Sequence, residues 1–229
     1  KLRIVNYITG MALIAALFSC SRKGDDSTNT DNPSSPQYFK TQSEAVLKGK
    51  NDLLNVMRSS AELKLTINPE LLQKSQPGII VKHLEIDFDR LLKQDQPTNL
   101  SQLSNNVKSS INTLMVDNNV ITVVQTTNSE KGWAVTGLAD ATLANDIDEV
   151  LSAQSNSRIE EITLYEIANL QAFIFQVKTL DGEAYYSKYD GFNLKEGASI
   201  DQLYPVLRSD AQLFDRKYGE EIKSKQLVK

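Results

Sequence analysis

One segment of the chain combines the residue types that acid–base and metal chemistry use. His83, Glu85, Asp87 and Asp89 alternate with apolar residues in "HLEIDFD". If the segment is a β-strand, a spacing of two places all four side chains on one face, about 6.5–7 Å apart between successive members. One imidazole and several carboxylates at such distances could hold a divalent cation, or place a proton donor beside a base.

A simpler interpretation of this segment is that its polar side faces water. Leu84, Ile86 and Phe88 point to the opposite side, which is the pattern of a strand with one buried face. Carboxylates in a row would also repel each other. A metal-dependent hydrolase that uses His83, Glu85 and Asp87 is therefore the last of our alternatives.

Other templates for catalysis are missing from the sequence. The single histidine excludes HExxH and three-histidine zinc sites, and a Ser–His–Asp triad could use only His83. The chain has no G-x-S-x-G elbow, no Walker A loop and no G-x-G-x-x-G motif. We therefore expect no enzymatic activity, and we expect no cofactor.

The only cysteine, Cys20, lies where a mostly apolar run ends and a polar segment begins. A cationic start followed by a short apolar run is the layout of a secretory signal, and the run is too short for a membrane span. Leu17-Phe18-Ser19-Cys20 resembles the lipobox of bacterial lipoproteins. The resemblance implies a signal peptide over residues 1–19, cleavage before Cys20, and acyl chains such as palmitate on this residue that anchor the protein in a membrane.

The residues after Cys20 refine the expected location. Ser21 takes the place of the aspartate that often retains lipoproteins at the inner membrane. The charged stretch 22–26 and Asp26-Ser27-Thr28 resemble the export and O-glycosylation signals of Bacteroidota surface lipoproteins. The resemblance implies an outer-membrane protein on the cell surface, with the periplasmic face as the alternative. Residues 20–37 contain too few apolar side chains to fold and predict a flexible, acidic tether.

Residues 38–229 predict an α+β fold in which helices pack on antiparallel hairpins. Helical spacing covers 41–60, 99–116, 145–154 and 199–218, and alternation covers 63–67, 79–89 and 158–167. Two hairpins are expected at 120–139 and 171–191. The stretches "IIVKHLEI" and "EEITLYEI" are alike, so two similar halves, 38–140 and 141–229, are an alternative to a single body. This order of elements resembles cystatin-like architecture, by analogy alone.

Aromatic residues supply the candidate contact surface. Trp133, Tyr185, Tyr186 and Tyr189 lie on or near the two predicted hairpins. Exposed tyrosine and tryptophan rings are typical of protein-binding hot spots and of platforms that stack on sugars. Because Tyr185 and Tyr186 are adjacent on a strand, we expect one of them in the core.

Composition bounds the class of partner. The net charge is −4 with acids and bases mixed, so we expect no nucleic acid partner. With Cys20 used for the anchor, the head has no disulfide and no thiolate nucleophile. We expect a lipid-anchored binding protein that acts through protein–protein contact, as an accessory or inhibitor-like subunit. Surface glycan binding is the alternative, and the partner and the oligomeric state are left open.

Overall fold

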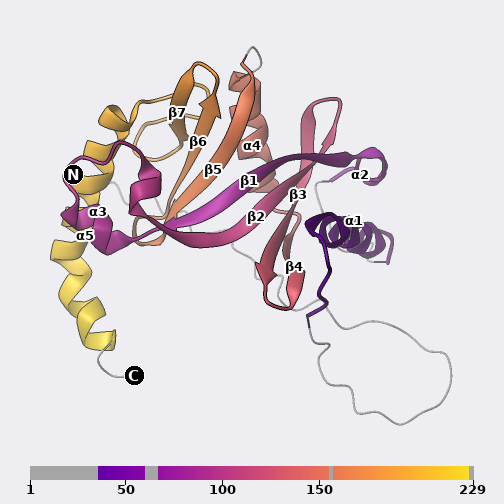
Figure 1. The fold of residues 1–229 in the computed structure, drawn as a ribbon, viewed down its shortest axis with the longest axis horizontal. Helices are drawn as coiled ribbons and strands as arrows, with labels where there is room; N and C mark the ends of the chain where they lie inside the picture. Colours follow the sequence, from indigo (N-terminus) through magenta and orange to yellow (C-terminus); the bar gives the residue numbers. More distant parts are fainter. Residues whose placement is uncertain (1–35, 60–66, 155–156, 227–229) are drawn as a thin grey trace, which may run out of the picture.

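One continuous β-sheet organises the protein. The computed structural model describes residues 36–59, 67–154 and 157–226. Seven strands are ordered β4-β3-β2-β1-β5-β6-β7 (Figure 1). Their bounds are β1 Gln76–Ile86, β2 Ser104–Val116, β3 Asn119–Ser129, β4 Gly132–Leu138, β5 Ile159–Ile167, β6 Ala172–Thr179 and β7 Gly182–Ser187. Together with the helices this confirms the predicted α+β class.

Two antiparallel meanders meet in the middle of the sheet. Strands β1 to β4 form one meander and β5 to β7 form the other. They join through β1 and β5, which are parallel, with Val81 opposite Ile162 and Glu85 opposite Glu166. The stretches "IIVKHLEI" and "EEITLYEI" thus lie side by side, in the same register in which their sequences align.

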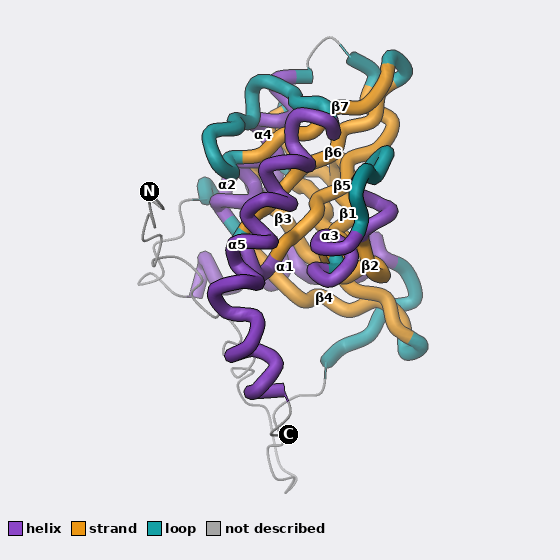
Figure 2. The backbone as a smooth tube through the Cα atoms, turned by 90° about the vertical axis from the view of Figure 1, so that its left-hand side faces the viewer, coloured by secondary structure: helices purple, strands orange, loops and turns teal. Residues whose placement is uncertain are grey.

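Three longer helices cover the sheet. They are α1 Gln42–Ser59, α4 Ala141–Ala153 and α5 Ile200–Gln226; α2 Pro69–Lys74, α3 Phe88–Lys93 and the single turns η1 Leu100–Leu103 and η2 Ala168–Leu170 are shorter. Helices α1 and α5 lie at opposite ends of the molecule, and α5 extends past the sheet at its C-terminal end (Figures 1 and 2).

The face covered by α4, here the α4 face, carries one part of the core. Ala144, Ile147 and Val150 of this helix pack with buried side chains from six strands. The strand residues in this cluster are Val81, Ile111, Val120, Val123, Ile162, Leu164, Phe175, Val177 and Tyr186.

The opposite face, here the two-helix face, is covered at one end by α1 and at the other by α5. Along a strand, each residue next to one that faces α4 points to this opposite face. Val124 follows Val123 and packs with α1, and Tyr165 follows Leu164 and packs with α5. The α1 cluster also contains Leu114, and the α5 cluster also contains Ile86, Ile167 and Ile174. The sheet is therefore buried on both faces, by helices at different places.

The predicted helix over 99–116 is wrong. Only the single turn η1 is helical there, and the 13-residue strand β2 follows it. The stretch is rich in serine, asparagine and β-branched residues, which favour a helix weakly. Because β2 pairs with β1 on one side and β3 on the other, tertiary pairing outweighs the helical spacing of its apolar residues.

The predicted strand over 79–89 is correct only in part. Strand β1 ends at Ile86, and Phe88 begins α3. Asp87 accepts a hydrogen bond from the Arg90 backbone N–H at 3.0 Å, so it caps this helix. Asp87 and Asp89 therefore do not extend the row of His83 and Glu85.

The remaining elements follow the sequence more closely. Both predicted hairpins form as β3–β4 and β6–β7, and β5 forms as expected. Helix α4 begins four residues before the predicted start, and α5 continues to Gln226, past the predicted end at residue 218. Of the predicted strand at 63–67, only residue 67 is described. The predicted signal peptide and Cys20 lie outside the described residues.

Candidate functional site

The aromatic residues singled out in the sequence are not brought together. Trp133 belongs to β4 and Tyr185 and Tyr186 belong to β7, which are the two opposite edges of the sheet. Tyr185 and Tyr186 are only 2% and 4% exposed, so both are in the core, where we expected one. An exposed row of these rings does not exist among the described residues.

Tyr185 belongs to a buried polar network on the two-helix face. Its hydroxyl donates to Glu183 at 3.0 Å and accepts from Gln176 Nε2 at 3.1 Å, and the Tyr165 hydroxyl donates to Gln176 Oε1 at 3.0 Å. Burial, with a smaller effect of the nearby Glu161 and Glu183, raises the pKa of Tyr165 to about 12. The pKa of Tyr185 is raised for the same reasons. These phenols act as neutral hydrogen-bonding cross-ties.

Trp133 and Tyr189 also have structural partners. The Trp133 backbone forms two hydrogen bonds with Phe39, at 2.7 and 2.9 Å, which fasten the N-terminal segment to the outer edge of β4. The Tyr189 hydroxyl donates to Asp210 of α5 at 2.7 Å. Each aromatic ring is half-buried. Trp133 thus holds the N-terminal segment against β4, and Tyr189 connects the segment after β7 to α5. Neither residue presents a free ring.

His83 is buried and forms the centre of a polar cluster. Its Nδ1 lies 3.1 Å from Ser109 Oγ on β2, and its Nε2 lies 3.0 Å from Glu166 Oε2 on β5. Lys108 Nζ donates to the same Glu166 oxygen at 2.6 Å. The prediction that His83 faces water is therefore wrong. Ser109 and Glu166 were not predicted, because only the pairing of β1 with β2 and β5 makes them neighbours of His83.

The electrostatics of this cluster keep the imidazole neutral and the carboxylate charged. Burial, together with Lys108, lowers the pKa of His83 and outweighs the opposite effect of Glu166. Burial would raise the pKa of Glu166, but hydrogen bonds and charge from Lys108 and His83 lower it overall. The charged pair is thus Lys108 with Glu166, and His83 is a neutral partner of both Glu166 and Ser109.

The order Ser109–His83–Glu166 is the order of a hydrolase triad, and its setting decides what it can do. Ser109 lies in the middle of a strand and is 6% exposed, so a substrate could not reach its Oγ. Neither Ser109 nor His83 lines the larger of the two hollows described, which lies next to them. The geometry favours a structural tie between three central strands.

The metal candidate His83, Glu85 and Asp87 is not assembled. His83 contacts Glu166 instead, and Asp87 caps α3. Asp89 lies 3.6 Å from Lys93 in the same helix. Within residues 36–59, 67–154 and 157–226, no group of three or more histidine, cysteine or acidic side chains is placed to hold a metal ion.

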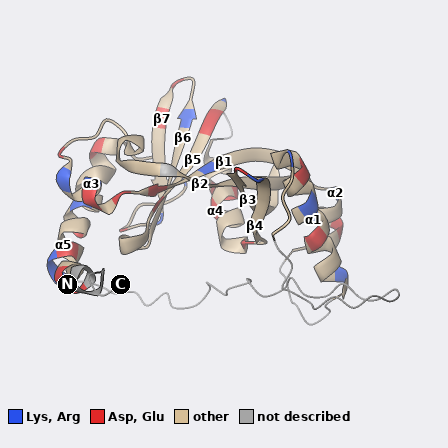
Figure 3. Ribbon diagram, turned by 60° about the horizontal axis from the view of Figure 1, so that its bottom comes forward, with Lys and Arg blue, Asp and Glu red and all other residues tan. Residues whose placement is uncertain are grey.

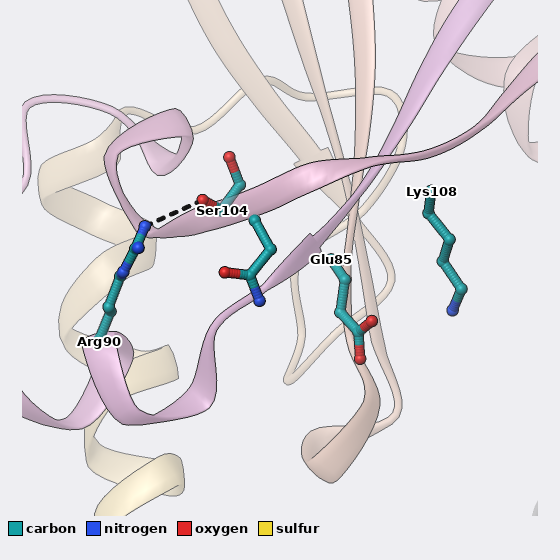
Figure 4. Close-up of a pocket in the computed structure, with 5 residues that line it drawn as sticks. Glu85, Arg90, Ser104 and Lys108 are labelled. Carbon is teal, nitrogen blue, oxygen red and sulfur yellow. Dashed lines mark hydrogen bonds between the residues drawn. The ribbon is translucent and has the colours of Figure 1, made fainter. Parts of the chain in front are cut away.

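A shallow hollow of about 520 Å³ lies beside the cluster (Figure 4). It is lined by Glu85, Arg90, Ser104, Asn105 and Lys108. Arg90 donates to the Ser104 carbonyl at 3.1 Å, and Lys108 is paired with Glu166. Because both cations already have partners, the hollow has little left with which to bind an anion.

The two-helix face has a central stretch that neither α1 nor α5 covers. We call it the open face and define it as Ile80, Lys82, Val107, Ser110, Glu161 and Lys178, which come from four adjacent strands. Ile80 is 50% exposed and Val107 is 59% exposed, although both belong to central strands. Aliphatic side chains at the centre of a sheet are usually covered, so the open face is the candidate contact surface.

Charge on the open face is organised around one carboxylate. Glu161 is in contact with Lys82, and its other oxygen lies 3.3 Å from Lys178. The hydrogen bond from Lys82 is the largest of the causes that lower the pKa of Glu161, so this group stays ionised. Two ammonium groups thus share one carboxylate on this face, and basic and acidic residues are scattered over the helices and strands of the molecule (Figure 3).

Known proteins give no independent guide to this surface. Within the described residues, no helix combines the length and apolar character that crossing a membrane requires. Comparisons with family models, with curated proteins and with solved structures found no match.

Proposed function

We propose that this protein is a non-catalytic binding protein that a lipid on Cys20 holds at the bacterial outer membrane. Its folded part contacts a protein partner, as an accessory or inhibitor-like subunit. The lipobox-like sequence around Cys20 supports the anchor, and the charged residues 22–26 support the cell surface as the location, with the periplasmic face as the alternative.

The observation that carries the binding role is the exposure of Ile80 and Val107. Each sits on a strand that is paired on both sides, in a sheet whose two faces are otherwise packed against helices. Full burial of a β-branched aliphatic side chain contributes about 1.5–3 kcal/mol, and leaving Ile80 and Val107 half-exposed gives up part of this free energy at each residue. A partner that covers them recovers this energy.

The alternatives receive less support from the described residues. A glycan platform would need exposed rings in a row, and Tyr185 and Tyr186 are buried at the edge opposite Trp133. A metal-dependent hydrolase would need His83, Glu85 and Asp87 around one ion, and these residues have separate partners.

The anchor is tested by growing cells with an alkyne fatty acid. The full chain should become labelled, and the Cys20→Ala variant should not. A Cys20→Ala chain that labels as strongly as the parent would overturn the lipid anchor.

The binding role is tested by photo-crosslinking in the cells that make the protein. A photoreactive residue at position 80 should give a discrete adduct with a second protein. The matched control is position 173, because Phe173 is 46% exposed but lies on the α4 face. Equal adducts from both positions, or none from position 80, would contradict the proposed function.

A further inference from the structure

The shallow hollow beside the His83 cluster is large enough for a small ligand. Its volume of about 520 Å³ falls within the range of small-molecule sites in proteins, about 300–1,000 Å³. Its lining residues come from β1, β2 and α3, and they are Glu85, Arg90, Ser104, Asn105 and Lys108 (Figure 4). By strand alternation Glu85 points to the α4 face, but no described residue of α4 lines the hollow. Helix α4 thus leaves this part of its face uncovered.

Both cations of the hollow are paired with acids other than Glu85. Lys108 Nζ lies 2.6 Å from Glu166 Oε2, and Arg90 Nε lies 3.7 Å from Asp87 Oδ2. The Arg90 guanidinium is turned to Ser104 and away from the Glu85 carboxylate (Figure 4). Among the described residues, none forms an ion pair with Glu85. Three carboxylates and two cations leave one negative charge here, and Glu85 is the group that carries it.

The neighbouring titratable groups do not change this balance. Burial lowers the pKa of His83, which precedes Glu85 by two residues on the same face of β1, so the imidazole is neutral at pH 7. Asp89 and Lys93 of α3 lie 3.6 Å apart and compensate each other. Glu85 is itself half-buried, so its carboxylate has lost part of its contact with water. A cation in the hollow would compensate both the charge and the lost hydration.

Two further residues offer free acceptors to the hollow. Ser104 Oγ donates its proton to the Ser101 carbonyl at 2.9 Å, which leaves the lone pairs of the hydroxyl oxygen for a ligand. Asn105 is exposed, and its side-chain amide makes no hydrogen bond with a described residue, so its Oδ1 is also available. Together with the Glu85 carboxylate, three residues can thus accept hydrogen bonds from one ligand.

We propose that the hollow binds a primary ammonium group, with Glu85 as its charged partner and Ser104 Oγ and Asn105 Oδ1 as neutral acceptors. An ammonium group has three N–H donors and no acceptor, and its hydrogen bonds to a carboxylate are charge-assisted. A small free amine and a lysine side chain of a protein both carry this group. The site lies on the α4 face and is separate from the open face, so it does not rest on the proposed function.

The test is NMR spectroscopy of the isotope-labelled full chain in mild detergent at neutral pH. The probes are ethanolamine, putrescine and a capped tripeptide with a central lysine, each compared with its N-acetylated derivative, which carries no charge. The amines should shift the backbone amide signals of Glu85 and Asn105, and the acetylated derivatives should not. Because the carboxylate supplies the charge, Glu85→Gln should lower the affinity for the amines at least about tenfold.

A matched control makes the same chemical change elsewhere. Glu70→Gln alters an exposed glutamate of α2 that has no ion pair with a described residue, and this variant should bind the amines like the parent. The thermal unfolding midpoint of Glu85→Gln should stay close to that of the parent, so that a loss of affinity is not a loss of fold. Asn105→Ala should lower the affinity by a smaller factor than Glu85→Gln, because it removes a neutral acceptor.

The probes also distinguish the two sources of the ammonium group. Tighter binding of the free amines would identify a small molecule as the ligand, and tighter binding of the tripeptide would identify a lysine of a protein. Signals of Glu85 and Asn105 that no amine shifts, equal shifts with the acetylated derivatives, or equal binding by Glu85→Gln would overturn the proposal. Crosslinking from position 80 tests the proposed function separately.

Discussion

Nε2 of His83 lies 3.0 Å from Oε2 of Glu166, across the one parallel pair among the seven described strands. This contact joins the two meanders on the α4 face, and Lys108 and Ser109 attach β2 to it. The polar residues that look like a reactive group in the sequence thus tie the centre of the fold together. This arrangement has consequences for stability that can be measured.

Stability should depend on pH through His83. Because the pKa of His83 is lowered in the folded protein, the unfolded chain takes up a proton at higher pH than the folded chain does. The free energy of unfolding should be highest above about pH 6.5 and should decrease as the pH falls below that value. Urea unfolding at a series of pH values measures this.

The variant His83→Gln supplies the control. His83 is the only histidine of the chain, so the variant removes the one side chain that ordinarily titrates in this range. Its stability should change less between pH 7 and pH 5.5 than that of the parent. An unchanged pH dependence would mean that His83 is not held in its neutral form.

Substitutions of Glu166 and Glu85 should have very different effects on the free energy of unfolding, although the two residues are opposite each other on β5 and β1. Glu166→Gln weakens the contacts with Lys108 and His83, and we expect a loss of about 1–3 kcal/mol at neutral pH. No described residue makes a hydrogen bond or ion pair with Glu85, so Glu85→Gln should change the free energy of unfolding by less than about 0.5 kcal/mol. Chemical unfolding of the two variants gives the comparison. Equal losses would show that the cluster is not specific to Glu166.

The clasp between Phe39 and Trp133 can be tested at Gly132. Gly132 has φ +111°, and an added Cβ would lie 2.5 Å from the Phe39 carbonyl oxygen. Gly182 has φ +143° with no atom within 4 Å of such a Cβ. Both Gly→Ala changes should strain the backbone, by about 1–3 kcal/mol. Only Gly132→Ala should also displace the N-terminal segment.

The chain's single tryptophan reports on that displacement. The Trp133 side chain should become more exposed to solvent in Gly132→Ala, and its fluorescence should report this change. In Gly182→Ala the fluorescence should stay like that of the parent. If the two variants lose equal stability and have the same fluorescence, the clasp adds nothing to the fold.

Two phenylalanines on β6 test where α4 ends. Phe175 is buried under this helix and Phe173, two residues earlier on the same face, is 46% exposed. We expect Phe175→Ala to cost about 3–5 kcal/mol and Phe173→Ala less than about 1 kcal/mol. Thermal unfolding measures both, and similar losses would contradict the placement of α4.

The sequence predicted most elements from local signals, and it failed where tertiary pairing decides. The alternation in "HLEI" predicts one buried face and one solvent-exposed face. Because Ser109 of β2 and Glu166 of β5 lie against its ring, His83 is buried as well as Ile86. The apolar residues of 99–116 have helical spacing by coincidence, and Val107 points to solvent.

One local signal for β2 was present in the sequence. Asp117-Asn118 separates two runs rich in aliphatic residues, and both residues have positive φ, as in the tight turns of hairpins. This turn identifies a β2–β3 hairpin that helical periodicity hides. The contacts of His83 with Ser109 and Glu166 had no such signal, because they depend on the register of strands far apart in the chain.

The fastening of Phe39 to Trp133 has a counterpart at the far margin of the sheet, where Tyr185 exchanges two backbone hydrogen bonds with Ala198. Each outermost strand therefore has part of its free ladder occupied by the protein's own chain. The proposed lipid anchor on Cys20 would bring copies together at high local density, and edge strands without such pairing would then act as templates for fibre growth. The bridges Phe39–Trp133 and Tyr185–Ala198 occupy part of each outermost strand and so hinder the pairing of two copies edge to edge.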